Sequence, residues 1–282
     1  MFAAPFEYLR PSTVDEAVAL LAQHGDDAKL LAGGHSLIPA MKMRLAQPRF
    51  IVDLGRVSGL SYIRESGNMI AIGAMTTHYA LESSALLGSK CPLIPETAQT
   101  IGDLQVRNRG TLGGSLAHAD PAADWPAAIL ALDAEIDLAG PQGRRTVKAD
   151  GFFVDLLQTR ARPDEVLCEI RVPATSKQVA YEKTEQKASG FAIVGVAVVV
   201  GKGGDVRIGV TGVASCAYRA KAVERALAGQ AAASSDAIAR AASHAGDGIE
   251  ALGDIHASPE FRLHLVEVNT ARALRRAYEI KN

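Results

Sequence analysis

The sequence predicts an α+β protein of two domains, and three observations favour this fold class. In the first half of the chain, the glycine pairs Gly33-Gly34 and Gly113-Gly114 stand beside apolar runs and helical stretches. In the second half, β-branched runs joined by a glycine loop precede alanine-rich stretches with helical spacing. A polar segment at residues 174–177 separates the two halves. With 282 residues and 48% hydrophobic content, the chain can bury a sizeable core.

The N-terminal residues predict a small βαβ-like unit. Thr13 and Glu16 form a capping box before a helix whose apolar positions share one face, and Gly25 ends that helix. The expected elements are this helix from Val14, strands at residues 29–32 and 50–54, and a second helix at residues 39–45 with Pro39 near its first turn.

The middle of the chain predicts a larger mixture of helices and strands. A strand ends at Gly73, and Thr76 or Thr77 caps a helix that begins near His78. The further elements expected here are helices at residues 93–101 and 121–132, a loop at 103–109, and strands at 135–138 and 145–148 around a turn at 140–143.

The C-terminal part predicts a sheet backed by helices. Two apolar runs rich in valine, at residues 191–200 and 206–213, read as a hairpin around the glycine loop at 201–204. Helices are expected at residues 220–227, 235–245 and 259–278.

The two glycine pairs predict an anion-binding site. Glycine lacks a Cβ and reaches positive φ at low cost, so each loop can direct successive N–H groups into one concavity. The hydroxyls of Thr111 and Ser115 would add donors. Two such loops fit the phosphates of a pyrophosphate dinucleotide, whereas one isolated glycine pair is more often an ordinary turn. We therefore expect the glycines at 33, 34, 113 and 114 to be required as glycines.

Other motifs narrow this interpretation. Neither the G-x-G-x-x-G pattern of Rossmann folds nor a P-loop occurs, so a dinucleotide would be held by another fold. His35 contacts the ligand or fills the turn of its loop. Arg107 and Arg109 either neutralise phosphate charge or are ordinary exposed arginines.

Composition and motifs argue against several other classes. A net charge of −1 does not favour nucleic acid as a partner. No apolar run reaches membrane-spanning length and no secretion signal opens the chain, so we expect a soluble, cytoplasmic protein. The three cysteines are far apart, which predicts buried free thiols and no metal or iron–sulfur site. The sequence has neither an HExxH nor a GxSxG motif.

Three motifs carry a family resemblance: AGGHS at residues 32–36, IGAMTTH at 72–78 and RNRGTLGGSLAHADPAADWPA at 107–127. With these, the chain resembles the FAD-binding medium subunit of molybdenum hydroxylases, the group of carbon monoxide dehydrogenase and the flavin domain of xanthine dehydrogenase. The resemblance implies a two-subdomain FAD-binding domain of the vanillyl-alcohol-oxidase/PCMH type over residues 1–176, divided at about 57/58. Residues 164–173 would form its closing strand, and residues 177–282 would form a smaller domain with an antiparallel sheet and helices.

The resemblance also implies a set of flavin contacts. Asp124 matches a flavin-contacting aspartate, while Asp120 reads as a helix cap and Trp125 as a core residue. Lys183, Lys187 and Phe191 lie where relatives approach the isoalloxazine, although many relatives carry tyrosine in place of Phe191. The implied FAD-binding residues are Ala32, Gly33, Gly34, His35, Ser36, Ile101, Thr111, Gly113, Gly114, Ser115, Asp124, Leu167, Lys183, Lys187 and Phe191.

By the same resemblance, noncovalent FAD would receive electrons from two iron–sulfur clusters on a small subunit and pass them to an external acceptor. A large subunit would hold the molybdenum centre, and the complex would be a dimer of heterotrimers. Two alternatives are a stand-alone flavin oxidoreductase and a flavin-binding module without turnover.

Overall fold

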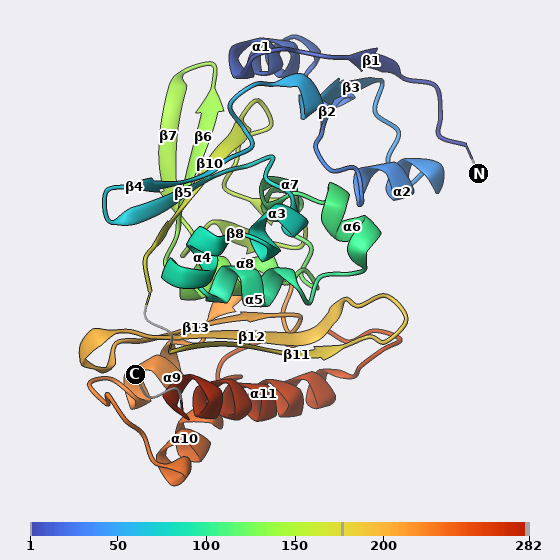
Figure 1. Cartoon of the computed structure of the whole chain (residues 1–282). Coiled ribbons are helices and arrows are strands. Elements are labelled where there is room, and N and C mark those ends of the chain that lie inside the picture. The colour runs from blue at the N-terminus through green and yellow to red at the C-terminus, as the bar shows by residue number, and fades with distance from the viewer. Residues whose placement is uncertain (1, 176–177, 280–282) are drawn as a thin grey trace.

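The computed structural model describes residues 2–175 and 178–279 of the chain. Three layers follow one another in Figure 1: an N-terminal unit, a middle sheet with a group of short helices, and a C-terminal sheet backed by the long helix α11. The expected boundary at residues 174–177 includes residues 176 and 177, which lie outside the described part.

The N-terminal unit is the expected βαβ arrangement with one additional strand. Its sheet is parallel in the order β1-β3-β2, and the sequence did not predict β1. Thr13 caps α1 and Gly25 ends it with φ +54°, but the Glu16 carboxylate accepts from the Ser12 backbone rather than from Thr13. The elements are β1 (Glu7–Leu9), α1 (Val14–His24), β2 (Ala28–Leu31), α2 (Leu37–Lys42) and β3 (Phe50–Asp53).

The middle sheet has five antiparallel strands in the order β4-β5-β10-β6-β7. The strands around the turn at 140–143 are confirmed, whereas β4 and the short pair β8 and β9 were not predicted. The strands are β4 (Ile63–Ser66), β5 (Met69–Gly73), β6 (Glu135–Gly140), β7 (Gly143–Lys148), β8 (Phe153–Asp155), β9 (Gln158–Thr159) and β10 (Val166–Pro173).

Short helices join this sheet to the C-terminal sheet, and three expectations for them were wrong. Residues 103–109 are not a loop, because the Asp103 side chain caps α6 by accepting from Val106 N–H. Residues 121–124 precede α8 as a turn, and α5 ends at Ala98. The helices are α3 (His78–Glu82), α4 (Ala85–Lys90), α5 (Leu93–Ala98), α6 (Leu104–Arg109), α7 (Leu112–His118) and α8 (Trp125–Ala131).

The C-terminal sheet is antiparallel, in the order β11-β12-β13-β14, and both of its faces are buried. On β12, Ala197 and Val199 join the core of the middle layer, while Val196 and Val198 join the core under α11. A strand buried on both faces reads as a continuous apolar run, as β12 does. The elements are β11 (Val179–Glu185), β12 (Ala192–Val200), β13 (Val206–Thr211), β14 (Tyr218–Arg219), α9 (Lys221–Ala226), α10 (Ser235–Ala242) and α11 (Pro259–Glu279).

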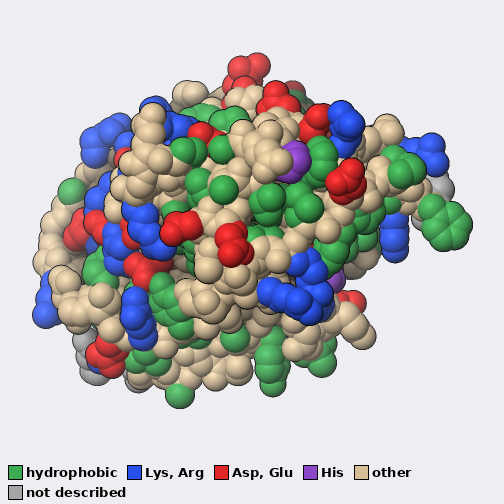
Figure 2. Space-filling model, turned by 90° about the horizontal axis from the view of Figure 1, so that it is seen from above, with side chains coloured by type: hydrophobic (Ala, Val, Ile, Leu, Met, Phe, Trp, Pro, Cys, Tyr) green, Lys and Arg blue, Asp and Glu red, His purple; other side chains and the backbone are tan. Residues whose placement is uncertain are grey.

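The surface seen from the N-terminal side carries charged side chains at one end and apolar side chains at the other. Figure 2 shows basic and acidic side chains interleaved on the side of the middle sheet, where Arg171 pairs with Glu135, Asp137 and Glu169. Apolar side chains are exposed at the other end of this view, where Figure 1 places the N-terminal segment and α2. Exposed apolar residues in and beside these segments are Phe2, Met43 and Leu45. Within residues 2–175 and 178–279, no helix is long and apolar enough to cross a bilayer.

Candidate functional site

The first glycine loop has the geometry of an anion-binding loop. Residues 33–36 connect β2 to α2, and Gly34 adopts φ +78°, a conformation that favours glycine. In the described chain the N–H groups of Gly33, Gly34, His35 and Ser36 donate to no other group. Successive unpaired N–H groups around a left-handed residue form a concavity that suits an anion. The exposed ring of His35 contacts the carbonyl oxygen of Gly33 at 3.1 Å, so it lies across its own loop.

The second glycine pair has a different geometry from the one expected. Gly113 and Gly114 lie in the first turn of α7 with negative φ, and Thr111 is the N-cap. Their N–H groups already donate to Ala74 O (2.8 Å) and Thr111 Oγ1 (3.1 Å). The proposed reason for these glycines was therefore wrong. A Cβ on Gly113 would stand 2.5 Å from the Ala74 Cβ, so close packing requires glycine there.

The two loops nevertheless lie side by side. A Cβ on Gly33 would stand 2.4 Å from the carbonyl oxygen of Arg109 and 2.8 Å from the Gly110 Cα. A Cβ on Gly114 would stand 3.3 Å from the Ala32 Cβ. Glycine at these positions lets the segment before α7 contact the first loop directly. The structure thus brings the two predicted loops into contact.

Of the two loop arginines, Arg107 is held by the protein itself. Its guanidinium donates to the carbonyl oxygens of Ile101 and Gly102 and pairs with Glu82 at 2.8 Å. These contacts fix the turn between α5 and α6. Arg109 is exposed, with no side-chain partner in the described chain, so it stays a candidate for phosphate contact.

Asp124 and Lys183 form a buried ion pair between the two halves of the chain. Asp124 Oδ1 lies 3.0 Å from Lys183 Nζ and accepts from the Tyr181 hydroxyl at 2.6 Å, and both charged side chains are 5% exposed. Lys183 also donates to Thr100 O at 2.9 Å. Burial raises the pKa of Asp124, while Lys183 and Tyr181 act in the opposite direction. Asp120 accepts from Ala122 N–H and so caps a turn, not the helix expected there.

The other predicted flavin contacts lie in two places, the loop between β11 and β12 and the core of the middle layer. Lys187 and the half-exposed Phe191 lie in the loop between β11 and β12. That loop approaches the α5–α6 turn, since a Cβ on Gly190 would be 3.7 Å from the Gly102 backbone. Ile101 is partly buried beside the middle core, and Leu167 on β10 belongs to that core.

Sequence reasoning missed two polar members of this region, Tyr181 and the side chain of His78. Residues two apart on a strand share one face, so 179, 181 and 183 face the same way on β11. This spacing could have placed Tyr181 beside Lys183. His78 is 5% exposed and accepts a hydrogen bond at Nδ1 from Trp125 Nε1 at 3.1 Å. Trp125 is fully buried, as expected for a core residue.

The buried His78 predicts a loss of stability in mild acid. Burial lowers its pKa to about 4, with His35 and Arg107 as smaller causes. In the unfolded chain the pKa returns to about 6.5, so the unfolded state binds a proton first as the pH falls. Between about pH 6.5 and 4 the free energy of unfolding should fall by up to about 3 kcal/mol.

Urea unfolding of the wild type and of His78→Gln, at neutral pH and near pH 4.5, measures this contribution. The variant should lose less stability than the wild type on acidification, because glutamine does not titrate. Equal losses in both proteins would contradict the assignment.

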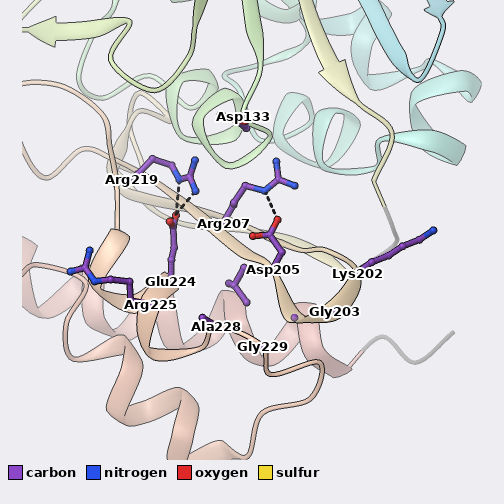
Figure 3. Close-up of a pocket in the computed structure, with 12 residues that line it drawn as sticks. Asp133, Lys202, Gly203, Asp205, Arg207, Arg219, Glu224, Arg225, Ala228 and Gly229 are labelled. Atoms are coloured by element: carbon purple, nitrogen blue, oxygen red, sulfur yellow. Dashed lines mark hydrogen bonds and ion pairs between the residues drawn. The ribbon is translucent and has the colours of Figure 1, made fainter.

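Two hollows in the structure are lined by residues outside the two glycine loops. A polar hollow of about 750 Å³ in the C-terminal domain contains the ion pairs Arg219–Glu224 and Arg207–Asp205, and Lys202 and Arg225 point away from it (Figure 3). An apolar hollow of about 220 Å³ lies between the N-terminal segment and α2. Its lining residues include Phe2, Phe6 and Ile38. Neither hollow offers the unpaired donors of the first loop.

Comparisons with known proteins agree with this geometry. The family profile "FAD binding domain in molybdopterin dehydrogenase" matches residues 4–175, and "CO dehydrogenase flavoprotein C-terminal domain" matches residues 179–277. The carbon monoxide dehydrogenase medium chain of Hydrogenophaga pseudoflava is 44% identical over 99% of both chains. That of Afipia carboxidovorans is 40% identical over 98% of both chains.

A solved structure is equally similar. It is of carbon monoxide dehydrogenase from Hydrogenophaga pseudoflava lacking the Mo-pyranopterin moiety of its cofactor, and one of its chains has a TM-score of 0.95, 45% identity and 99% coverage of both chains. These matches confirm the expected α+β, two-domain FAD-binding fold and identify FAD as the cofactor. The chain belongs to the family of FAD-binding medium subunits of molybdenum-containing hydroxylases, an oxidoreductase family that includes carbon monoxide dehydrogenase.

Proposed function

We propose that this chain transfers electrons from iron–sulfur clusters through FAD to an external acceptor, within a molybdenum-containing hydroxylase or dehydrogenase complex. The observation that carries the proposal is the contact between the two glycine loops, with four unpaired N–H groups at residues 33–36. When bound, FAD supplies the redox chemistry, because a flavin exchanges electrons one or two at a time.

The residues of this chain hold and orient the cofactor in the proposed function. The N–H groups of the first loop bind the diphosphate, and the N-terminal turn of α7 closes on it from the other side. Positive partial charge at a helix start favours an anion, even though the first N–H groups of α7 are already paired. Lys187 and Phe191 lie in the loop between β11 and β12, and we propose that they approach the flavin ring. We propose that the remaining residues of the implied set also line the FAD site, with Gly113 and Gly114 contributing through close packing and not through their N–H groups.

The metal cofactors belong to other chains in this proposal. Among residues 2–175 and 178–279, no group of three or more histidine, cysteine or acidic side chains could hold a metal ion. We propose a large molybdenum-binding subunit and a small iron–sulfur subunit as partners, in a dimer of heterotrimers. The description of similar proteins as medium chains supports such an assembly. The acceptor is a quinone, NAD or oxygen, and the complex would act in the cytoplasm.

The domain division is part of the same proposal. We place the FAD-binding domain at residues 1–176, with subdomains at about 1–57 and 58–176, and the C-terminal domain at 177–282. The three-stranded, five-stranded and four-stranded sheets each fall within one of these segments, which supports the division.

The visible absorption spectrum of the isolated chain, before and after addition of FAD, tests the binding step. We expect a flavin spectrum, and the released cofactor should have the mass of unmodified FAD. Dithionite should reduce the bound flavin, whereas substrates of stand-alone flavin oxidases should not. A chain that binds no FAD, alone or coexpressed with iron–sulfur and molybdenum subunits, would contradict the proposal.

The same preparation separates the two alternatives. A redox subunit should accept electrons from its reduced iron–sulfur partner and copurify with it. A flavin-binding module without turnover would bind FAD but pass no electrons to an acceptor, and a stand-alone oxidoreductase would turn over without partners.

A further inference from the structure

His78 lies between the two glycine loops. It is the first residue of α3, and its backbone N–H donates to Gly110 O at 3.0 Å. The preceding residue, Thr77, forms a β-bridge with Thr111. A Cβ on Gly110 would stand 2.6 Å from His78 Nε2, and Gly110 in turn contacts Gly33. Gly110 therefore lies between the Nε2 edge of the His78 ring and Gly33 of the first loop.

The hydrogen bond from Trp125 fixes the tautomer of this ring. An indole N–H can only donate, so Nδ1 of His78 must present a lone pair. The buried ring is neutral at physiological pH, and its single proton must then reside on Nε2. His78 is thus a neutral donor with a fixed direction.

The Nε2–H group has no partner in the described chain, yet Nε2 is not sealed from solvent. Since Nε2 stays accessible while the rest of the ring is buried, its N–H is free to donate to a ligand atom. Other donors lie in the neighbouring first loop, where the N–H groups of residues 33–36 have no partner in the described chain. The Arg107 guanidinium adds positive potential at the ring. The several oxygens of an anionic diphosphate could accept from these donors.

We propose that His78 is a further cofactor-binding residue, whose Nε2–H donates to a phosphate oxygen of FAD held between the two loops. This inference rests on the proposed function. Trp125 is the positioning residue that orients the donor, and Gly110 lacks the Cβ that would cover Nε2.

The test compares His78→Leu, which removes the donor, with His78→Gln, whose amide can donate near the position of Nε2. FAD affinity is measured by quenching of flavin fluorescence, and ADP is the competing probe because it carries the diphosphate without the flavin. His78→Leu should weaken FAD and ADP equally, by roughly 10- to 100-fold, the value of one hydrogen bond to a charged group. His78→Gln should remain within a few-fold of the wild type.

His244→Leu is the matched control, because His244 is a half-exposed surface histidine paired with Asp247. It should leave both affinities unchanged. Wild-type affinity in His78→Leu would overturn the inference, and a loss for FAD without a loss for ADP would overturn the phosphate assignment. A wild-type chain that binds no FAD, either alone or coexpressed with the partner subunits, would overturn the proposed function and this inference with it.

A measurement on the unmutated protein does not depend on how the variants fold. Nitrogen-15 NMR of histidine-labelled protein should show His78 protonated at Nε2 in the FAD-free state. Addition of FAD should shift the Nε2 resonance and leave His244 unchanged. Protonation at Nδ1, or an Nε2 signal that does not respond to FAD, would overturn the inference.

Discussion

Replacement of Lys183 by methionine is expected to lower the free energy of unfolding of the FAD-free protein by about 3–5 kcal/mol. The substitution leaves the Asp124 carboxylate buried without its charged partner, and both side chains are only 5% exposed. It also removes the donor to Thr100 O, which ties β11 to the end of α5. Equilibrium urea unfolding without FAD measures the loss, so that cofactor binding does not contribute to it.

A second lysine–aspartate pair across the same two halves provides the control. Lys221 and Asp150 lie 2.9 Å apart, but their side chains are 56% and 44% exposed. Lys221→Met should cost at most about 1 kcal/mol, because solvent screens an exposed pair. The double variant Lys183→Met, Asp124→Leu should be no less stable than Lys183→Met alone, since it removes the unpaired charge. A loss below about 1 kcal/mol in Lys183→Met would contradict the burial of this pair.

Replacement of Gly33 by alanine is expected to weaken FAD binding by roughly 100-fold or more while the protein stays folded. The new Cβ would stand 2.4 Å from Arg109 O and 2.8 Å from the Gly110 Cα, and both are backbone atoms that cannot rotate away. The first loop must then move away from the α6–α7 segment, which separates the two sides of the proposed diphosphate site. Fluorescence titration with FAD measures the effect, and circular dichroism monitors the fold.

Gly88→Ala is the matched control for this prediction. Gly88 is an exposed helical glycine in α4, and a Cβ there would meet nothing within 4 Å. Alanine should leave FAD affinity unchanged and raise stability by up to about 1 kcal/mol, because it reduces the conformational freedom of the unfolded chain. If Gly33→Ala bound FAD as tightly as Gly88→Ala, the contact between the loops would not matter for binding.

Local signals predicted the elements that depend on residues close together in sequence. The cap at Thr13, the stop at Gly25 and the turn at 140–143 are such cases, since each depends on neighbouring backbone groups. The α6 helix was missed although Asp103 is an N-cap residue, because its six residues carry little periodicity. The strand β1 was also missed, because a strand of three residues is stabilised mainly by its parallel partner β3.

At the candidate site, the two segments that carry the glycine pairs lie in contact, but the physical reason for three of the four glycines was different. Only Gly34 has positive φ. Gly33 and Gly113 are required by close approach to atoms of other segments, and a Cβ on Gly114 would crowd the Thr111 side chain that caps α7. Sequence spacing holds no information about such distances. The expectation that both loops present free N–H groups therefore holds for residues 33–36 alone.

The sequence by itself determined the fold class, the order of the main elements, the family and its cofactor, because motifs of five to twenty residues carry that information. Only the tertiary structure decided which polar groups are free to meet a ligand. It paired Asp124 with Lys183 and the N–H groups of Gly113 and Gly114 with Ala74 and Thr111. Among residues 2–175 and 178–279, it gave no partner to the Nε2–H of His78 or to the N–H groups of residues 33–36. The reason is that a buried donor or acceptor takes its partner from whichever segment packs against it, and that choice is made only when the chain folds.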